Sequence, residues 1–259
     1  ERDPGRRDPG RPQVSHTALI GTGVMGETLL AGLLRAGWAP TSIVGADRRE
    51  SRRQELEGRY GVRCVESPAD AVDGADTVLL VVKPQDVADL LPAIAPHLAE
   101  GALLVSLCAG VTTAQLEAGL PEGTPVVRVM PNTPAQVSEG MAAVSAGVHA
   151  AEVDLEKAVH IMEAVGQAVV VPEKYQDAVT AISGSGPAYL FFVVEAMIDA
   201  GVMLGLPRDI STKLVNQTMF GSAKLLVESE QHPNLLREMV TSPAGTTAAA
   251  LRHLEERSV

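Results

Sequence analysis

The sequence predicts an α/β protein in which a parallel sheet, covered by helices on both faces, is followed by an all-helical C-terminal domain. From His16 to about Val171, short apolar runs alternate with segments whose apolar residues recur at helical spacing. Apolar strands separated by amphipathic helices are typical of a parallel sheet that is buried on both faces. After about Pro172 only helical patterns remain, so we expect a sheet domain at residues 16–171 and a helical domain at residues 172–259.

The strands of the sheet domain are predicted where apolar runs stand between polar or glycine-containing segments. The predicted strands are Thr17–Ile20, Ile43–Ala46, Thr77–Val82, Leu103–Leu107, Pro125–Val129 and Met141–Ala146. Helical spacing and charge patterns predict helices between them. The predicted helices are Met25–Ala36, Arg49–Tyr60 and Val87–Ile94.

Four helices are predicted in the C-terminal domain: Asp177–Ile182, Pro187–Leu204, Arg208–Ser229 and Thr246–Glu256. Pro187 and Pro207 stand at or just before a first helical turn, where proline is tolerated. The stretch Tyr189–Leu204 is apolar nearly all round, and a helix of that kind needs cover on every side. We therefore expect a partner subunit to cover it, with a central helix in a monomeric bundle as the alternative.

The bulk composition excludes several classes of protein. Lys and Arg number 21 against 32 Asp and Glu, and a net charge of −11 argues against a nucleic-acid or anionic-membrane surface. Cys64 and Cys108 fit neither a disulfide framework nor a metal knuckle, and the six histidines show no ligand spacing, so no metal site is expected. We expect a reducing, cytoplasmic compartment, and the apolar run Ala188–Val194 is too short to span a membrane.

The first fifteen residues contain a tandem repeat, Arg2–Arg6 and Arg7–Arg11, made of Pro, Gly and mixed charges. Without apolar anchors such a segment cannot offset the entropy of ordering, so residues 1–15 are expected to form a disordered tail. A binding arm is the alternative. No apolar stretch precedes Thr17, so no signal peptide is expected.

A glycine-rich motif follows the first predicted strand and opens the first predicted helix. A strand before and a helix after are the context in which Gly-x-Gly-x-x-Gly binds a dinucleotide. Gly21 permits a tight turn, Gly23 lets the backbone approach the pyrophosphate, and Gly26 lets the helix and strand pack closely. The N–H groups at the helix start then hold the phosphates. We predict a Rossmann-type domain with cofactor contacts from Ile20, Gly21, Thr22, Gly23, Val24, Met25 and Gly26.

The choice between NADPH and NADH depends on the residues after the second predicted strand. Asp47 stands where an acidic residue would bond the adenosine ribose hydroxyls and repel a 2′-phosphate. Arg48 and Arg49 follow at once, Arg52 and Arg53 come a turn later, and a guanidinium can pair with that phosphate or stack on adenine. We assign Asp47 and Arg48 to the cofactor site and expect NADPH, with NADH as the alternative. The other interpretation of the arginines is a solvated helix start.

Further segments end predicted strands at the sheet edge where ligands of parallel sheets bind. From two of these strand ends we expect cofactor contacts by Val81, Val82, Lys83, Pro84, Cys108 and Ala109. The segment Met130–Pro134 carries two prolines around Asn132 and Thr133, which make a rigid turn at the same edge. A purely structural turn is the alternative there.

Three stretches of the chain resemble the pyrroline-5-carboxylate reductase family. They are Met130–Pro134, Ile182–Tyr189 and Val240–Thr247, in that order, and the resemblance covers about Thr17–Glu256. It implies NAD(P)H-dependent reduction of the C=N bond of 1-pyrroline-5-carboxylate to L-proline, the last step of proline biosynthesis. It also implies a helical dimerisation domain that interleaves with its counterpart in a homodimer or a larger ring.

The resemblance implies that the loop Ser242–Thr247 binds the substrate. Its contacts would come from Ala244, Gly245, Thr246 and Thr247. A helix start offers unpaired N–H groups and a positive dipole end that suit the carboxylate of an imino acid, although an N-cap without a ligand is the alternative from the residues alone. Thr247 is the catalytic candidate, as a hydrogen-bond donor to the ring nitrogen. Glu173 is implied to line the site from the other subunit.

Some residues depart from the family pattern, and two other functions compete. Ala244 stands where the family usually has glycine, Pro68 where some members have a polar cofactor contact, and Met239 where some have asparagine. A β-hydroxyacid dehydrogenase would need a lysine on the helix after the domain boundary, and residues 189–204 contain none. A non-catalytic dinucleotide sensor is favoured only by Ala244 and by a C-terminus about one helix shorter than in most family members.

Overall fold

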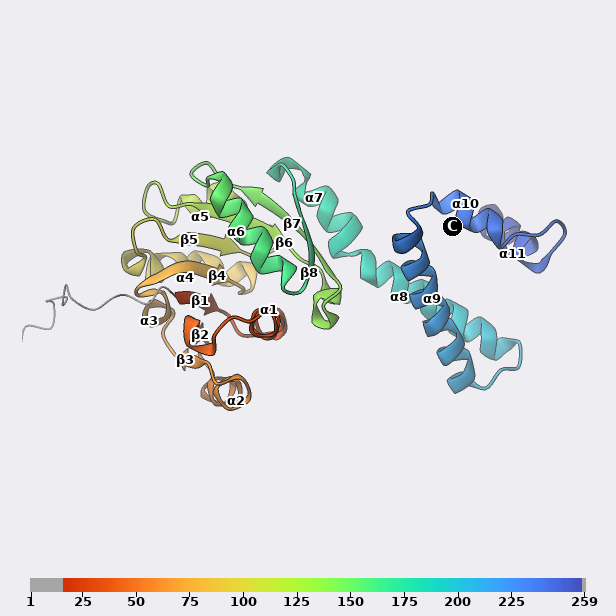
Figure 1. Ribbon diagram of the computed structural model, residues 1–259, viewed down its shortest axis with the longest axis horizontal. Coiled ribbons are helices and arrows are strands. Elements are labelled where there is room, and N and C mark those ends of the chain that lie inside the picture. The colour runs from red at the N-terminus through yellow and green to blue at the C-terminus, as the bar shows by residue number, and fades with distance from the viewer. Residues whose placement is uncertain (1–15, 258–259) are drawn as a thin grey trace, which may run out of the picture. The chain divides into compact units, whose positions relative to one another are not determined.

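The computed structural model describes residues 16–257, so the predicted tail at residues 1–15 lies outside the described residues. The chain forms two compact units, the first ending at Pro187 and the second beginning at Ala188 (Figure 1). In the described chain the last strand ends at Val170, and every element after it is helical. All strands therefore belong to the first unit.

The first unit is built on one eight-stranded sheet within the described residues, in the order β3-β2-β1-β4-β5-β6-β7-β8. Its strands are β1 His16–Ile20, β2 Ile43–Ala46, β3 Arg63–Val65, β4 Ala75–Leu80, β5 Leu103–Ser106, β6 Val126–Met130, β7 Gly140–Ala146 and β8 Gly166–Val170. The six predicted strands are all present, with ends that differ by at most two residues, and the predicted fold of a helix-covered sheet is confirmed.

One strand corrects the expectation of a purely parallel sheet. β7 pairs antiparallel with β6, whereas every other neighbouring pair in the described sheet is parallel. The connection between β6 and β7 contains only the 3-10 turn Thr133–Val137. A parallel crossover needs a dozen or more residues, so this short connection returns the chain in the opposite direction.

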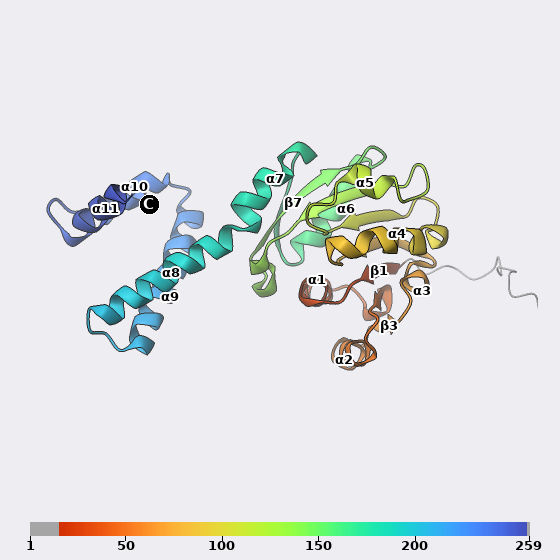
Figure 2. The same ribbon diagram turned by 180° about the vertical axis from the view of Figure 1, so that it is seen from behind.

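Helices cover both faces of the sheet (Figures 1 and 2). These helices are α1 Val24–Arg35, α2 Glu50–Tyr60, α3 Pro68–Val72, α4 Val87–Ile94, α5 Thr113–Glu117 and α6 Glu152–Glu163. Helices α1, α2 and α6 contribute to one buried apolar cluster, and α3, α4 and α5 contribute to another. The strands alternate between the two clusters: Leu19 belongs to the first, and Ala18 and Ile20 belong to the second.

The sequence patterns did not single out β3, β8, α3, α5 or α6. Strand β3 and helix α3 have three and five residues, which is too short for a periodic pattern to emerge. Helix α6 buries only Ala158, Ile161 and Met162 against the sheet, among many charged residues. Such a narrow apolar stripe is recognisable only when the face that it covers is known.

Helical structure begins before the end of the first unit. The 3-10 turn Glu173–Tyr175 leads into α7, Gln176–Val179, and then into a π-helical turn, Thr180–Gly184. The amide of Ser185 donates to the carbonyl of Thr180 at 2.8 Å, which is the five-residue spacing of a π-turn. The helix predicted at Asp177–Ile182 is therefore present as an α-helical turn followed by a π-turn.

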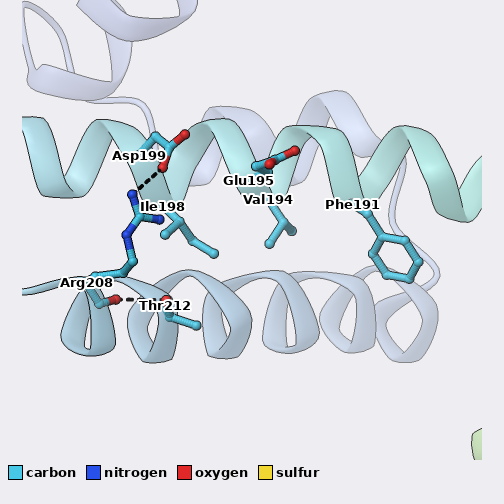
Figure 3. A pocket seen from close by; sticks show the side chains of 7 residues that line it. All are labelled: Phe191, Val194, Glu195, Ile198, Asp199, Arg208 and Thr212. Carbon is cyan, nitrogen blue, oxygen red and sulfur yellow. Dashed lines mark hydrogen bonds and ion pairs between the residues drawn. The ribbon is translucent and has the colours of Figure 1, made fainter.

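The second unit consists of α8 Gly186–Met203, which begins two residues before it, α9 Arg208–Ser229, α10 Pro233–Met239 and α11 Thr246–Glu256. The predictions of α8, α9 and α11 are confirmed, and α10 was not predicted. Helices α8 and α9 approach closely at Gly201, where a Cβ atom would lie 2.2 Å from the Ser211 hydroxyl. Arg208 also pairs with Asp199 at 2.8 Å across them (Figure 3).

The second unit buries little of its apolar surface by itself. Among its described residues only Ser211 and Val215 are buried, whereas many large apolar side chains are exposed. Between α8 and α9 lies an open pocket of about 420 Å³, lined by Phe191, Val194, Glu195, Ile198, Asp199, Arg208 and Thr212 (Figure 3). Isolated, this arrangement lacks the core that a stable domain requires.

One continuous helical segment, Glu173–Met203, is long and apolar enough to cross a membrane by length and composition, with a mean hydropathy of 1.4. The core helix of a soluble protein meets the same criterion, so the segment is weak evidence for a membrane span. Its apolar residues need cover, and the sequence-based expectation is that a partner subunit supplies it.

Candidate functional site

The glycine loop between β1 and α1 has the conformation that its spacing predicts. Gly21 has a φ of +92°, and a Cβ there would lie 2.3 Å from the carbonyl oxygen of Val81. A Cβ on Gly26 would lie 2.1 Å from the carbonyl oxygen of Gly21, so the helix start packs directly on the loop. Gly23 has no atom within 4 Å of its Cβ position, and no side chain caps α1. The first amides of α1 are thus open to an anion.

Four strand ends meet around this loop. Gly21 donates its amide hydrogen to the carbonyl of Ala46 at 3.1 Å, and Val81 donates to the carbonyl of Ile20 at 2.8 Å. Cys108 lies beside them, and its thiol donates to the carbonyl of Val82 at 3.3 Å. The predicted contacts on β1, β4 and β5 are therefore close together, at the carboxyl ends of the strands.

The exposure of these predicted contacts differs. Lys83, Pro84 and Ala109 are exposed beyond the strand ends, whereas Thr22 and Cys108 are buried. Burial raises the pKa of the Cys108 thiol, so this side chain is a packed, inert group. At this strand end the exposed residue Ala109, rather than Cys108, is accessible to a ligand.

Asp47 directly follows β2, and its carboxylate is held by two neighbours. Its Oδ2 atom accepts from the Thr22 hydroxyl at 2.7 Å, and its Oδ1 atom accepts from the amide of Arg49 at 3.0 Å. The Arg49 guanidinium also donates to both oxygens, at 3.2 and 3.3 Å. Partial burial acts to raise the pKa of Asp47, but the hydrogen bonds from Arg49 and Thr22 outweigh it and lower the pKa to about 2.

The arginines after β2 differ in how firmly their side chains are held. Arg53 donates to the carbonyls of Asp47 and Arg48, at 2.8 and 3.0 Å, and its side chain is 16% exposed. Within residues 16–257 the side chain of Arg49 is bonded to Asp47 alone, and it is 66% exposed. Arg48 is exposed, and among the described residues its guanidinium has no ion-pair partner. Arg48 can therefore turn toward a ligand directly, whereas Arg49 can do so only by leaving Asp47.

Sequence reasoning missed a clamp that joins α2 to the glycine loop. The guanidinium of Arg52 donates to the carbonyl of Thr22 at 2.9 Å and pairs with Glu27 in the first turn of α1. Glu27 also accepts from Arg59 and from the Tyr60 hydroxyl. Arg52 and Arg59 stand two turns apart on one face of α2, a charge pattern that identifies the face but not its partner.

Glu173 lies in the first unit, in a cluster with β6 and α5. Its Oε1 atom accepts from the amide of Thr113 at 2.8 Å and from Arg128 at 3.0 Å, and its Oε2 atom accepts from the Thr113 hydroxyl at 2.7 Å. Burial acts to raise the pKa of Glu173, but the bonds from Thr113 and Arg128 lower it overall. The Arg128 side chain is 6% exposed, so this carboxylate neutralises a buried cation.

Two of the three family-like stretches lie against each other. Asn132 accepts from the amide of Met141 at 2.8 Å, and its side-chain amide donates to the carbonyl and hydroxyl of Ser183 at 3.3 Å. A Cβ on Gly184 would lie 2.6 Å from Cε of Met130. The turn Met130–Pro134 thus anchors the π-turn Thr180–Gly184.

The third stretch forms a tight turn before α11. The amide of Gly245 donates to the carbonyl of Ser242 at 3.0 Å, Pro243 stands second, and Ala244 stands third with a φ of 59°. These are the features of a type II turn, whose third position favours glycine. Gly245 is the N-cap of α11, and no side chain caps this helix. Its first amides, including that of Thr247, are open.

The described residues contain no group of three or more His, Cys, Asp or Glu side chains that could hold a metal ion. Each unit therefore offers its own candidate site: backbone amides at the start of α1, with a few polar side chains, in the first unit, and backbone amides at the start of α11 in the second. Such groups bind anions and orient a ligand. They supply neither a strong base nor a nucleophile.

Comparison with known proteins supports one family. The model described as pyrroline-5-carboxylate reductase dimerisation matches residues 173–259, and the model described as NADP oxidoreductase coenzyme F420-dependent matches residues 16–110. A pyrroline-5-carboxylate reductase of Corynebacterium melassecola is 44% identical over 236 residues, which cover 90% of this chain and 87% of that protein. One of Mycobacterium tuberculosis is 45% identical over 252 residues, with 88% and 85% covered.

Solved structures agree with this result. The pyrroline-5-carboxylate reductase of Coxiella burnetii matches with a TM-score of 0.89 and 34% identity, over 94% of this chain and 91% of that one. A Plasmodium falciparum pyrroline carboxylate reductase with NADP bound matches with a TM-score of 0.84 and 31% identity, over 95% and 91% of the two chains. The chain therefore belongs to the pyrroline-5-carboxylate reductase family.

Proposed function

We propose that this chain reduces 1-pyrroline-5-carboxylate to L-proline with NADPH. The observation that carries the proposal is the 44% identity to a pyrroline-5-carboxylate reductase over 90% of the chain. The open glycine loop and the uncapped start of α11 are consistent with it, because the reaction needs a dinucleotide site and an anion site.

The first unit would hold the cofactor. The open side of Gly23 and the uncapped α1 fit a pyrophosphate, which a side chain at Gly23 would obstruct. The strand ends at Ile20, Val81 and Val82, with exposed Lys83, Pro84 and Ala109, would face the rest of the dinucleotide. The match to an NADP oxidoreductase model and the relative solved with NADP support NADPH, and NADH remains the alternative.

The start of α11 would hold the substrate carboxylate. The amides of Thr246 and Thr247 are open at a helix N-terminus, whose dipole favours an anion, and Gly245 is the N-cap that leads into it. Ala244 shapes the turn that presents them. Glu173 stays a predicted substrate contact, although its hydrogen bonds in the described chain favour a structural role.

Thr247 would position the reacting ring. Reduced nicotinamide, when bound, supplies a hydride to the carbon of a C=N bond. The half-buried Thr247 hydroxyl, which has no side-chain hydrogen bond among the described residues, would donate to the ring nitrogen and keep the C=N carbon toward the cofactor. A protonated imine is already electrophilic, so positioning is the main task of the protein.

A second copy of the chain would cover the second unit, forming a homodimer or a larger homo-oligomer. The dimerisation model matches residues 173–259, nearly the whole of the proposed helical domain at residues 172–259. The exposed apolar residues of α8 and α9 then become an interface, which accounts for the segment Glu173–Met203 without a membrane. A cytoplasmic location fits a biosynthetic reductase of this kind.

A spectrophotometric assay tests the function. We expect the near-ultraviolet absorbance of NADPH to fall when 1-pyrroline-5-carboxylate is added, with L-proline as the product identified by chromatography. A protein that consumes NADPH only with an oxo acid, and forms NADPH from NADP⁺ and the corresponding hydroxyacid, would instead be a dehydrogenase of the related fold. One that binds NADPH without consuming it with any of these compounds would be a sensor.

Substitution of Thr247 tests the mechanism in the same assay. We expect Thr247→Ala to lower kcat/KM by about 10- to 100-fold, the worth of one hydrogen bond to a charged group. Thr247→Ser should restore most of it. Thr246→Ala keeps the backbone amide and should change little. Full activity of Thr247→Ala would remove this hydroxyl from the mechanism.

A further inference from the structure

The carboxylate of Asp47 is fully occupied by the protein itself. It accepts hydrogen bonds from the Thr22 hydroxyl, from the amide of Arg49 and twice from the Arg49 guanidinium. An ionised carboxylate has about four acceptor positions, so no position is left for a ligand. Its low pKa, about 2, keeps it charged and paired at neutral pH.

This arrangement affects two nucleotides in opposite ways. A ribose with a free 2′-hydroxyl gains affinity by donating to an acidic residue at the end of the second strand. Here that hydroxyl has to displace Arg49 first. A 2′-phosphate is repelled by a free carboxylate, but the Arg49 guanidinium cancels the charge of Asp47 and can itself pair with a phosphate.

Arg49 is the residue of this group that can exchange partners. Its side chain is 66% exposed, and Asp47 is its partner in the described structure. Arg52 and Arg53 are 13% and 16% exposed and are bound to backbone carbonyls, so they are fixed. Arg48 is exposed, and no hydrogen bond or ion pair joins its side chain to Asp47 in the part of the chain that the structure describes.

We propose that Arg49, through its pair with Asp47, makes this enzyme prefer NADPH to NADH. It occupies the acceptor that NADH would use and supplies positive charge where NADPH carries its 2′-phosphate. This inference rests on the proposed dinucleotide-dependent function, and it assigns the preference to one residue of that site.

Equilibrium binding of two adenosine fragments tests the proposal without turnover. Calorimetry on the full chain would measure 2′,5′-ADP, which carries the 2′-phosphate, and 5′-ADP, which has the free hydroxyl. In Arg49→Gln we expect the affinity for 2′,5′-ADP to fall about tenfold, the worth of one charge-assisted hydrogen bond. The affinity for 5′-ADP should rise, because Asp47 is released. Structural damage lowers both affinities, so opposite changes identify the mechanism.

Three further variants act as controls. Arg63→Gln removes the same charge at an exposed position of β3 and should leave the ratio of the two affinities unchanged. Arg52→Gln loosens the glycine loop, so it should lower both affinities by a similar factor. In the double variant Asp47→Asn, Arg49→Gln the gain for 5′-ADP should disappear, since the released acceptor is gone.

The outcomes separate the inference from the proposed function. An unchanged affinity ratio in Arg49→Gln, or an equal loss of both fragments, overturns the role of Arg49 while the enzyme remains a reductase. If the unaltered protein binds neither fragment and neither NADPH nor NADH, the proposed function fails, and the inference fails with it. Steady-state kcat/KM for the two nucleotides should follow the fragment ratio.

Discussion

Ala244 adopts a backbone conformation that an alanine tolerates poorly. Its φ of 59° at the third position of the Ser242–Gly245 turn is the left-handed region, where a Cβ atom crowds the following carbonyl. The family resemblance led us to expect glycine at this position, and the turn forms here with alanine. The loop therefore forms its turn with a strained residue at the third position.

We expect Ala244→Gly to raise the free energy of unfolding by up to about 1 kcal/mol, because glycine adopts this φ without strain. Ala250→Gly, in the exposed interior of α11, should lower it by about 1 kcal/mol, since glycine weakens a helix. Chemical denaturation with urea measures both. If the two variants are destabilised alike, Ala244 carries no strain.

Asp47 links acid stability to the cofactor site. Its pKa is lowered from 3.8 to about 2, so its ionised form stabilises the folded chain. For a lowered carboxyl pKa, the contribution is present above the unfolded value and is lost as the pH falls toward the folded one. The lowering of the pKa corresponds to about 2 kcal/mol of stability at neutral pH. Solvent screens this contribution little, because the Asp47 side chain is only 11% exposed.

We expect Asp47→Asn to be less stable than the unaltered chain at neutral pH, with the difference vanishing between about pH 4 and 2. Urea unfolding at a series of pH values measures this difference. Asp70→Asn, at an exposed position of α3, should follow the unaltered chain throughout. A constant difference down to the lowest pH would show that the Asp47 charge is not its cause.

At the scale of elements, Glu173 joins the first helical turn after the sheet to β6 and α5. Its carboxylate is bonded to both Thr113 and Arg128, and the Arg128 side chain is buried. Removal of one partner from a buried ion pair leaves an uncompensated charge, which costs about 3 kcal/mol. The clamp between α2 and the glycine loop works by the same principle, through Arg52 and Glu27.

Glu173→Gln should lower the free energy of unfolding by about 3 kcal/mol and leave the KM for 1-pyrroline-5-carboxylate nearly unchanged. Glu139→Gln, at an exposed position, is the matched control and should change neither. Denaturation and steady-state kinetics together decide the role of Glu173. A higher KM with unchanged stability would favour the sequence-based prediction that Glu173 lines the substrate site.

At the scale of the whole molecule, the second unit depends on association. Phe192 on α8 is 73% exposed and Phe220 on α9 is 63% exposed, which a soluble domain does not sustain without cover. The match of the dimerisation model to residues 173–259 indicates a second copy as that cover. Folding and oligomerisation are then linked, so stability depends on protein concentration.

We expect the unaltered chain to sediment as a dimer or larger oligomer, with a Tm that rises with concentration. Phe192→Asp should shift it to monomer and lower the Tm, because a charge would be buried in the interface. Val148→Asp is the matched control, since Val148 is 82% exposed in the first unit and should not change the oligomer. A monomeric unaltered chain would contradict the proposed dimer.

Much of the fold followed from local patterns. The bounds of β2, α4, α9 and α11 match the predicted segments residue for residue, because an apolar run or a helical stripe reports burial directly. The antiparallel direction of β7 could not be predicted from these patterns, because it depends on the short connection between β6 and β7. Strand β3 carries too few residues for any pattern.

The sequence by itself determined the glycine loop, the loop before α11 and the family, because each is carried by short stretches of residues that are adjacent in the chain. Only the tertiary structure decided that Arg49 pairs with Asp47, that Arg52 pairs with Glu27, and that Glu173 neutralises Arg128. A charged side chain can reach several partners within the length of its stem. Which partner it meets is decided by how the helices pack on the sheet, and that packing is a property of the whole fold.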